Sequence, residues 1–246
     1  MAVTLNKLVF DIKNMAYGGV SSDDAKISDK QIAYWIMNER SMLLSQAMGK
    51  KLRVPASCVE TLESVYLEVV DSAEACEVDL GVHVLKSIKP IPRTVQRNHL
   101  DSILAVESLD GERAFSETTT FRRKWNKYNK YTSSKNRWYI KDSHIYVSCD
   151  ILIEAVKVTG VFEDAEEVWL HNVCPEDYAL PGEIADNTKS CDYNWDTPFP
   201  ISMTLAEQVA SIVLQKRIQV TLTLPNDETN NAKGDGDQQM QRAAAK

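Results

Sequence analysis

The chain has 246 residues, 43% of them hydrophobic and 26% charged, which is ordinary for a globular protein with a core of its own. No apolar run approaches the roughly 18 residues needed to cross a bilayer, and residues 1–14 lack the basic flank and apolar stretch of a secretory signal. We therefore expect a protein that folds in a cytoplasm and has no membrane partner. Its five cysteines are odd in number and lack paired spacing, so we expect free thiols.

A helix is predicted over residues 28–50, after a loop-rich arm over residues 1–27 that contains Gly18-Gly19. Ser28 can cap this helix because Gln31 stands three residues later, where a capping box needs it. Pro55 prevents an easy continuation, so the helical segment ends at about residue 54. Apolar residues recur inside it at spacings of three, four and seven, which is typical of an amphipathic helix: Ile32, Trp35, Ile36, Leu43, Leu44 and Ala47.

The pattern changes to period two between residues 55 and 165, which predicts a β-rich domain. Asp110-Gly111 and the polar residues 141–144 are hairpin turn signals, and Gly160 suggests a bulge or a close backbone approach. Because no helical period interrupts this region, we expect antiparallel pairing in a sandwich-like arrangement with a long hairpin arm. Alternating or short apolar runs predict strands at 62–70, 103–109, 138–140, 145–147 and 154–162.

The last third of the chain ends in a second predicted helix. Residues 166–200 read as an irregular connection with a short helix near 165–170. An apolar stripe then predicts a C-terminal helix within 201–224, capped by Ser202 or Thr204, and residues 225–246 have the polar composition of a disordered tail. The expected fold class is therefore α+β, with N- and C-terminal amphipathic helices packed together around a central antiparallel β-rich region.

No catalytic motif stands out, and we expect no enzyme, cofactor or metal. His171, Cys174 and Cys191 could supply three zinc ligands, but zinc sites show tighter paired spacing and four ligands. Carboxylates cluster at residues 163–167, where acid–base work through Asp164 or Glu166 would require a burial that the sequence does not indicate. A charged turn after a strand is the simpler interpretation.

The sharpest physical feature is a basic, aromatic arm at residues 121–141. Eight basic residues and no acidic one fall between Arg122 and Lys141. Because the whole chain has a net charge of −7, the residues outside this segment together carry a charge of −15. One interpretation is contact between subunits. The candidate contact residues come from the predicted helix over 28–50 and from the arm: Ile32, Trp35, Ile36, Arg122, Arg123, Lys124, Trp125, Lys127, Tyr128 and Tyr131. Nucleic-acid binding is the alternative: Arg122, Arg123, Lys124, Lys127 and Lys130. A solvated loop is the third.

Several short motifs resemble structural proteins of crAss-like bacteriophages. They are residues 9–14, Gly18-Gly19, residues 22–24, the helix residues Gln31-Ile32, Trp35-Ile36 and Arg40, then residues 160–164 and 198–203. The resemblance spans about residues 9–225, and no motif within 55–150 carries it. It implies a virion protein of the portal-to-tail connector, similar to head-to-tail adaptors, assembled in the host cytoplasm. It also implies a ring of twelve copies around the DNA channel, with the portal protein, neighbouring tail ring proteins and genomic DNA as partners.

Overall fold

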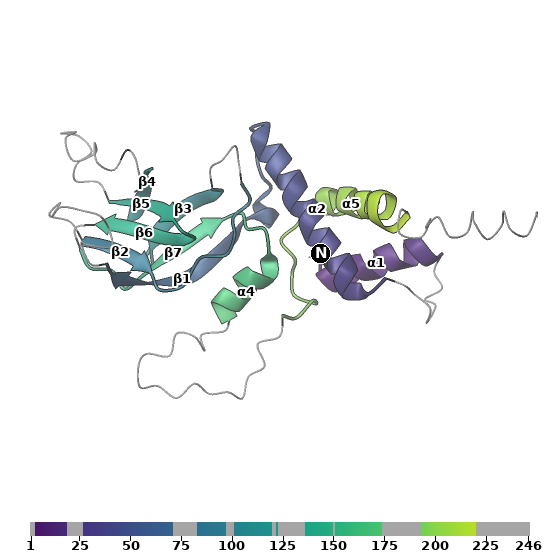
Figure 1. Ribbon diagram of the computed structural model, residues 1–246, viewed down its shortest axis with the longest axis horizontal. Helices are drawn as coiled ribbons and strands as arrows, with labels where there is room; N and C mark the ends of the chain where they lie inside the picture. The colour runs from purple at the N-terminus through teal and green to yellow at the C-terminus, as the bar shows by residue number, and fades with distance from the viewer. Residues whose placement is uncertain are drawn as a thin grey trace, which may run out of the picture.

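The computed structural model combines a closed β-barrel with a cluster of helices at one end of it (Figure 1). The residues that it describes are 3–18, 27–70, 83–96, 101–119, 122, 136–149, 151–173 and 193–219. None of the helices in these ranges is long and apolar enough to cross a membrane. The predicted tail at 225–246 and most of the basic arm lie outside the described residues.

The barrel has seven strands, and its closure replaces the expected sandwich-like arrangement. The strands are β1 (Glu60–Val69), β2 (His83–Ser87), β3 (Ile103–Ser108), β4 (Ala114–Glu117), β5 (Arg137–Lys141), β6 (His144–Cys149) and β7 (Ala155–Gly160). They close in the order β1-β2-β6-β5-β4-β3-β7. All pairs are antiparallel except β4 with β5, which is parallel, so the expectation of antiparallel pairing is wrong for this one pair of strands.

Both predicted hairpin turns are confirmed. The β3–β4 turn places Gly111 at φ 72°, a left-handed conformation that glycine adopts without steric cost. The β5–β6 turn places Asp142 at φ 53° and Ser143 at φ 61°, as a two-residue turn with positive φ at both positions requires. Turn chemistry in the sequence therefore fixes the register of both hairpins.

The prediction for Gly160 is also confirmed. A side chain at this position would bring its Cβ to 3.0 Å from the Ser102 carbonyl oxygen and 3.4 Å from the Ile103 Cα. The β3–β7 register shifts between Ile103 and Ala105, opposite the glycine. β3 and β7 therefore approach each other so closely at this point that a side chain here would force the neighbouring backbone to shift by a few tenths of an ångström.

The arm expected at residues 1–27 is instead helical over residues 5–17. Helix α1 (Leu5–Tyr17) is capped by the Thr4 side chain, which accepts a hydrogen bond from the Lys7 N–H, and ends at Gly18 with φ 65°. Its buried residues Leu5, Leu8, Val9 and Ile12 form one apolar stripe at spacings of three, four and seven.

The other predicted helices are confirmed in position. Helix α2 (Asp29–Gly49) begins at Ser28, whose hydroxyl oxygen accepts a hydrogen bond from the Gln31 N–H at 3.3 Å. Helix α5 (Met203–Ile212) is capped by Ser202 and continues as a π-helical segment, η3 (Val213–Ile218). The short helix α4 (Ala165–Val173) follows the barrel. A 3₁₀ turn, η1 (Ala56–Cys58), leads from α2 into the barrel.

The barrel and the helical cluster each have an apolar core of their own. One fills the barrel with the inward side chains of its strands, including Leu62, Trp138 and Ile145. The other joins α1, α2, α5 and η3, with Ile12, Ile36 and Val209 fully buried in it. A smaller cluster where α2 meets the barrel includes Cys58, a buried free thiol as expected, while Cys149 is buried in the barrel core. The other three cysteines lie outside the described residues.

Candidate functional site

Helix α2 lies between the barrel and the last helix, and its surfaces define the candidate site (Figure 1). Two neighbouring residues of α2, Glu39 and Arg40, are both buried although both carry charge. They point to different partners, because Glu39 contacts Arg217 on η3 and Arg40 contacts the barrel and its flanking segments. Buried charges require partners, so the elements on both sides of α2 are held by specific contacts.

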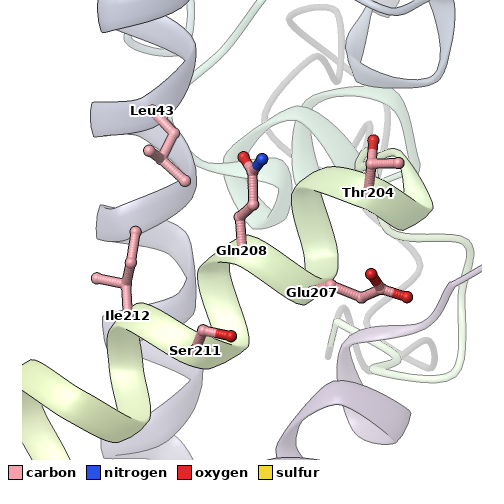
Figure 2. A pocket seen from close by; sticks show the side chains of 6 residues that line it. All are labelled: Leu43, Thr204, Glu207, Gln208, Ser211 and Ile212. Carbon is pink, nitrogen blue, oxygen red and sulfur yellow. The ribbon is translucent and has the colours of Figure 1, made fainter.

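A shallow groove lies where α2 meets α5 (Figure 2). Leu43 of α2 and Ile212 of α5 form its apolar side. The remaining lining residues are polar side chains of α5: Thr204, Glu207, Gln208 and Ser211. These six residues include no histidine, lysine or cysteine, so no nucleophile here has a neighbouring base other than one exposed carboxylate. This composition fits a contact surface better than a catalytic centre.

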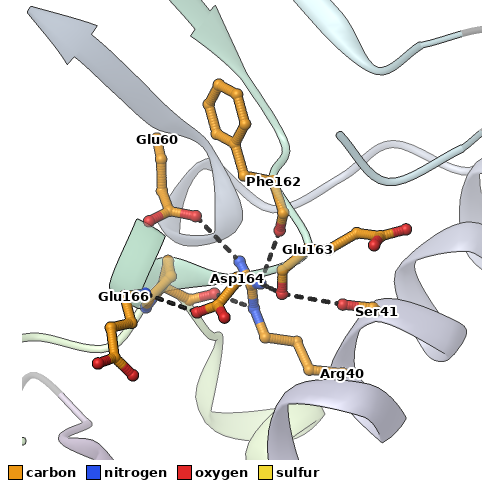
Figure 3. A network of polar contacts seen from close by, with 8 residues as sticks. Arg40, Ser41, Glu60, Phe162, Glu163, Asp164 and Glu166 are labelled. Carbon is orange, nitrogen blue, oxygen red and sulfur yellow. Dashed lines mark hydrogen bonds and ion pairs between the residues drawn. The ribbon is translucent and has the colours of Figure 1, made fainter. Parts of the chain in front are cut away.

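Arg40 is the centre of the seam between the helices and the barrel (Figure 3). Its Nε donates a hydrogen bond to the Pro200 carbonyl oxygen at 2.8 Å, and its Nη1 donates to the Phe162 carbonyl oxygen at 2.9 Å. Its Nη2 lies 3.4 Å from Oε2 of Glu60. The guanidinium also lies over the Phe199 ring, 5.5 Å from the ring centroid. One side chain thus joins the beginning of β1, the end of β7 and the segment before α5.

Neighbouring polar groups extend the seam along the chain that leaves β7. The Ser41 hydroxyl donates to the Glu163 carbonyl oxygen at 3.1 Å. The Asp164 carboxylate accepts a hydrogen bond from the Glu166 N–H at 2.8 Å and so caps α4 (Figure 3). The acidic cluster at 163–167 therefore shapes a helix start, which agrees with the simpler interpretation of a charged turn.

Burial dominates the electrostatics of the seam. Desolvation lowers the pKa of Arg40, and the neighbouring Glu60 carboxylate partly opposes that shift. Desolvation also raises the pKa of Glu60 to about 7, against the opposing effect of Arg40 and with a further upward push from Asp164. The Glu60 carboxyl group therefore titrates near neutrality, in contact with a guanidinium that has no access to solvent.

A second ion pair fastens the opposite face of α2. Nε and Nη2 of Arg217 lie 3.3 Å and 3.1 Å from Oε1 of Glu39, whose side chain is 3% exposed. Arg217 belongs to the π-helical segment, which widens the last helical turns and is a rare geometry. This pair ties the end of the last helix to the middle of α2.

Four of the predicted site residues lie within the described residues, and the others do not. Ile32 and Ile36 are buried in the helical core of the chain itself, which leaves neither side chain a surface for a neighbouring subunit, and Trp35 packs against the same core. Arg122 is exposed. The other arm residues lie outside the described residues, and their roles stay predictions: Arg123, Lys124, Trp125, Lys127, Tyr128, Lys130 and Tyr131.

Only one of the three candidate zinc ligands lies within the described residues. His171 lies in α4, where burial lowers its pKa, while Cys174 and Cys191 lie outside the described residues. Within the described ranges, no group of three His, Cys, Asp or Glu side chains is placed to hold a metal ion.

Sequence reasoning missed the role of Arg40, although a signal was present. Arg40 stands four residues after Ile36 and four before Leu44, so it interrupts the apolar stripe of α2 with a charge. A charged residue on the buried face of a helix must find a partner in the core. Its main partners are backbone carbonyls more than 120 residues away, which no local pattern can indicate.

Comparison with known proteins adds one finding. The family model described as phage tail ring protein 2 matches residues 7–239, which is nearly the whole chain. A search of curated proteins gives no significant match.

We expect the variant Arg40→Met to lose about 3–5 kcal/mol of unfolding free energy, because it leaves the Glu60 carboxylate buried without its cation. Urea unfolding measures the loss. The exposed Arg53→Met is the matched control and should change stability by less than about 0.5 kcal/mol. Equal losses in the two variants would contradict a special role for Arg40. The double variant Arg40→Met with Glu60→Gln should recover part of the stability, since neither partner is then left charged alone.

We also expect a pH-dependent difference between the wild type and Glu60→Gln. The folded-state pKa is raised from 4.5 to about 7, so the folded protein keeps a proton on Glu60 where the unfolded chain has lost it. The resulting stabilisation is fully present below pH 4.5 and is lost as pH rises through about 7. The wild type should therefore weaken relative to Glu60→Gln by about 3 kcal/mol across this window. A difference that stays constant with pH would refute the assignment.

Proposed function

The chain belongs to the phage tail ring protein 2 family, and from this membership we propose that it is a structural subunit of a ring in the portal-to-tail connector of a bacteriophage. The family identifies a phage tail protein that acts in the virion and assembles with itself. The proposal goes further and gives the ring a position between portal and tail, where it surrounds the DNA channel. Its role there is mechanical rather than catalytic.

The observation that carries the proposal is the extent of the family match, which takes in both the helical cluster and the barrel. The geometry of the seam supports it. A ring closes only if every copy presents two different surfaces at one fixed angle. The Arg40 and Glu39 contacts hold the barrel, α2 and the last helix in one arrangement, so that surfaces on different elements keep a constant relation.

The chemistry of the described residues agrees with a non-catalytic role. The groove between α2 and α5 offers one carboxylate and two hydroxyls without an imidazole or amine. The buried ionisable groups of the seam are occupied with one another and with backbone carbonyls. We infer that the ring holds twelve copies and contacts the portal protein, neighbouring tail ring proteins and passing DNA. The basic arm serves a subunit contact in this scheme.

The direct test is electron microscopy of the purified protein and of phage particles. We expect the purified chain to form closed rings, alone or after addition of the portal complex, and the same ring to appear once per particle between head and tail. Mass spectrometry of purified particles should detect the chain in a fixed ratio to the portal protein. Particles that lack the chain, or a protein that stays monomeric under both conditions, would contradict the proposal.

A further inference from the structure

The two parts of the chain differ in charge. The described residues of the helical part, 3–18, 27–58 and 193–219, contain nine basic and five acidic side chains. The described residues of the barrel and α4, 59–70, 83–96, 101–119, 122, 136–149 and 151–173, contain eight basic and fourteen acidic side chains. The formal charges are therefore +4 and −6. Copies of such a chain attract each other most strongly when a helical part faces a barrel.

The positive charge gathers where α2 ends. Lys50, Lys51 and Arg53 are all exposed, and Leu52 between them is 60% exposed. The chain turns sharply here, with Lys51 at φ 59°, so the leucine and the three cations stand out beyond the helix. We refer to residues 50–53 as the basic corner. The basic corner therefore combines one exposed apolar side chain with a single sign of charge, and it attracts a surface of opposite charge.

An oppositely charged counterpart lies on the barrel. The β3–β4 turn exposes Leu109 (55%) together with Asp110 and Glu112. Asp110 accepts hydrogen bonds from the Ser108 hydroxyl and from the Glu112 N–H, and these bonds hold its pKa below the usual range. We refer to residues 109–112 as the acidic turn. Like the basic corner, it places one exposed leucine beside charges of a single sign, but here the charges are negative.

The corner and the turn lie at opposite ends of the barrel. The basic corner follows Met48 of α2, which packs with Val161 just beyond the end of β7. β3 begins beside the same end, where Ile103 pairs with Gly160, and runs away from α2 to Ser108. Six residues of strand span about 17–20 Å. The acidic turn therefore points away from the basic corner of its own chain, so these two surfaces meet only between different copies.

We propose that in the ring the acidic turn of one copy docks on the basic corner of the next copy. This inference rests on the proposed function, because it assigns the self-association of the ring to two named surfaces. The interface is heterologous, as ring closure requires, since the two surfaces differ and recur on every copy. Leu109 and Leu52 supply the apolar contact, and the flanking charges set the orientation.

The test uses charge reversal in the full-length chain. One variant, Lys50→Glu with Arg53→Glu, reverses the corner and keeps Lys51, whose left-handed backbone should not be disturbed. The other, Asp110→Asn with Glu112→Lys, reverses the turn and keeps an oxygen at position 110 for the two hydrogen bonds. The control Lys7→Glu with Lys216→Glu makes the same change in net charge as the corner variant, at exposed positions elsewhere. Urea unfolding should show that all three keep the wild-type stability.

We expect each reversed variant to need at least about tenfold more protein than the wild type to form rings by light scattering and electron microscopy. The control should assemble like the wild type. An equimolar mixture of the two reversed variants should regain assembly, because each reversed surface then meets an opposite charge on the alternating neighbour. Reversed variants that assemble normally, or a mixture that does not recover, would overturn the inference and leave the ring proposal standing. A wild type that never assembles would remove both.

Discussion

The guanidinium of Arg40 is the constraint on which the rest of the structure depends. It has no access to solvent, and it is satisfied by carbonyl groups of Pro200 and Phe162 and by the Glu60 carboxylate. These partners come from the segment before α5, the end of β7 and the beginning of β1. A buried cation without those partners would cost several kcal/mol. The helices and the barrel are therefore stable together in the one arrangement that surrounds this charge.

We expect such a seam to contribute more to specificity than to stability. A well-packed apolar pair of similar volume can be as stable as a buried ion pair, whereas loss of one partner costs about 3–5 kcal/mol of a total stability of about 5–15 kcal/mol. Directional hydrogen bonds also tolerate less sliding than an apolar contact does. A ring subunit benefits from this property, since an error in angle between its surfaces accumulates around the ring. The Glu39–Arg217 pair applies the same constraint to the last helix.

Local patterns in the sequence predicted the parts of the fold that local chemistry decides. Ser28 and Gln31 start α2, Asp110-Gly111 sets one hairpin, and Gly160 marks the close approach of β3 and β7. The predicted loop over residues 5–17 was wrong because the Gly18-Gly19 signal outweighed a short apolar stripe. Barrel closure through β1 with β7 and β4 with β5 depends on distant pairing, which period-two alternation cannot distinguish from a sandwich. The seam was hidden for the same reason, because backbone carbonyls carry no sequence signature.

Native-state hydrogen exchange is the most direct test of the claim that one buried charge makes the chain a single unit. The slowest amides of α2 around Arg40 and those of β7 should exchange with the same opening free energy, because neither part opens without breaking the seam. In Arg40→Met the two sets should separate, with the amides of α2 and β7 opening at different free energies. Two distinct opening free energies already present in the wild type would contradict the account.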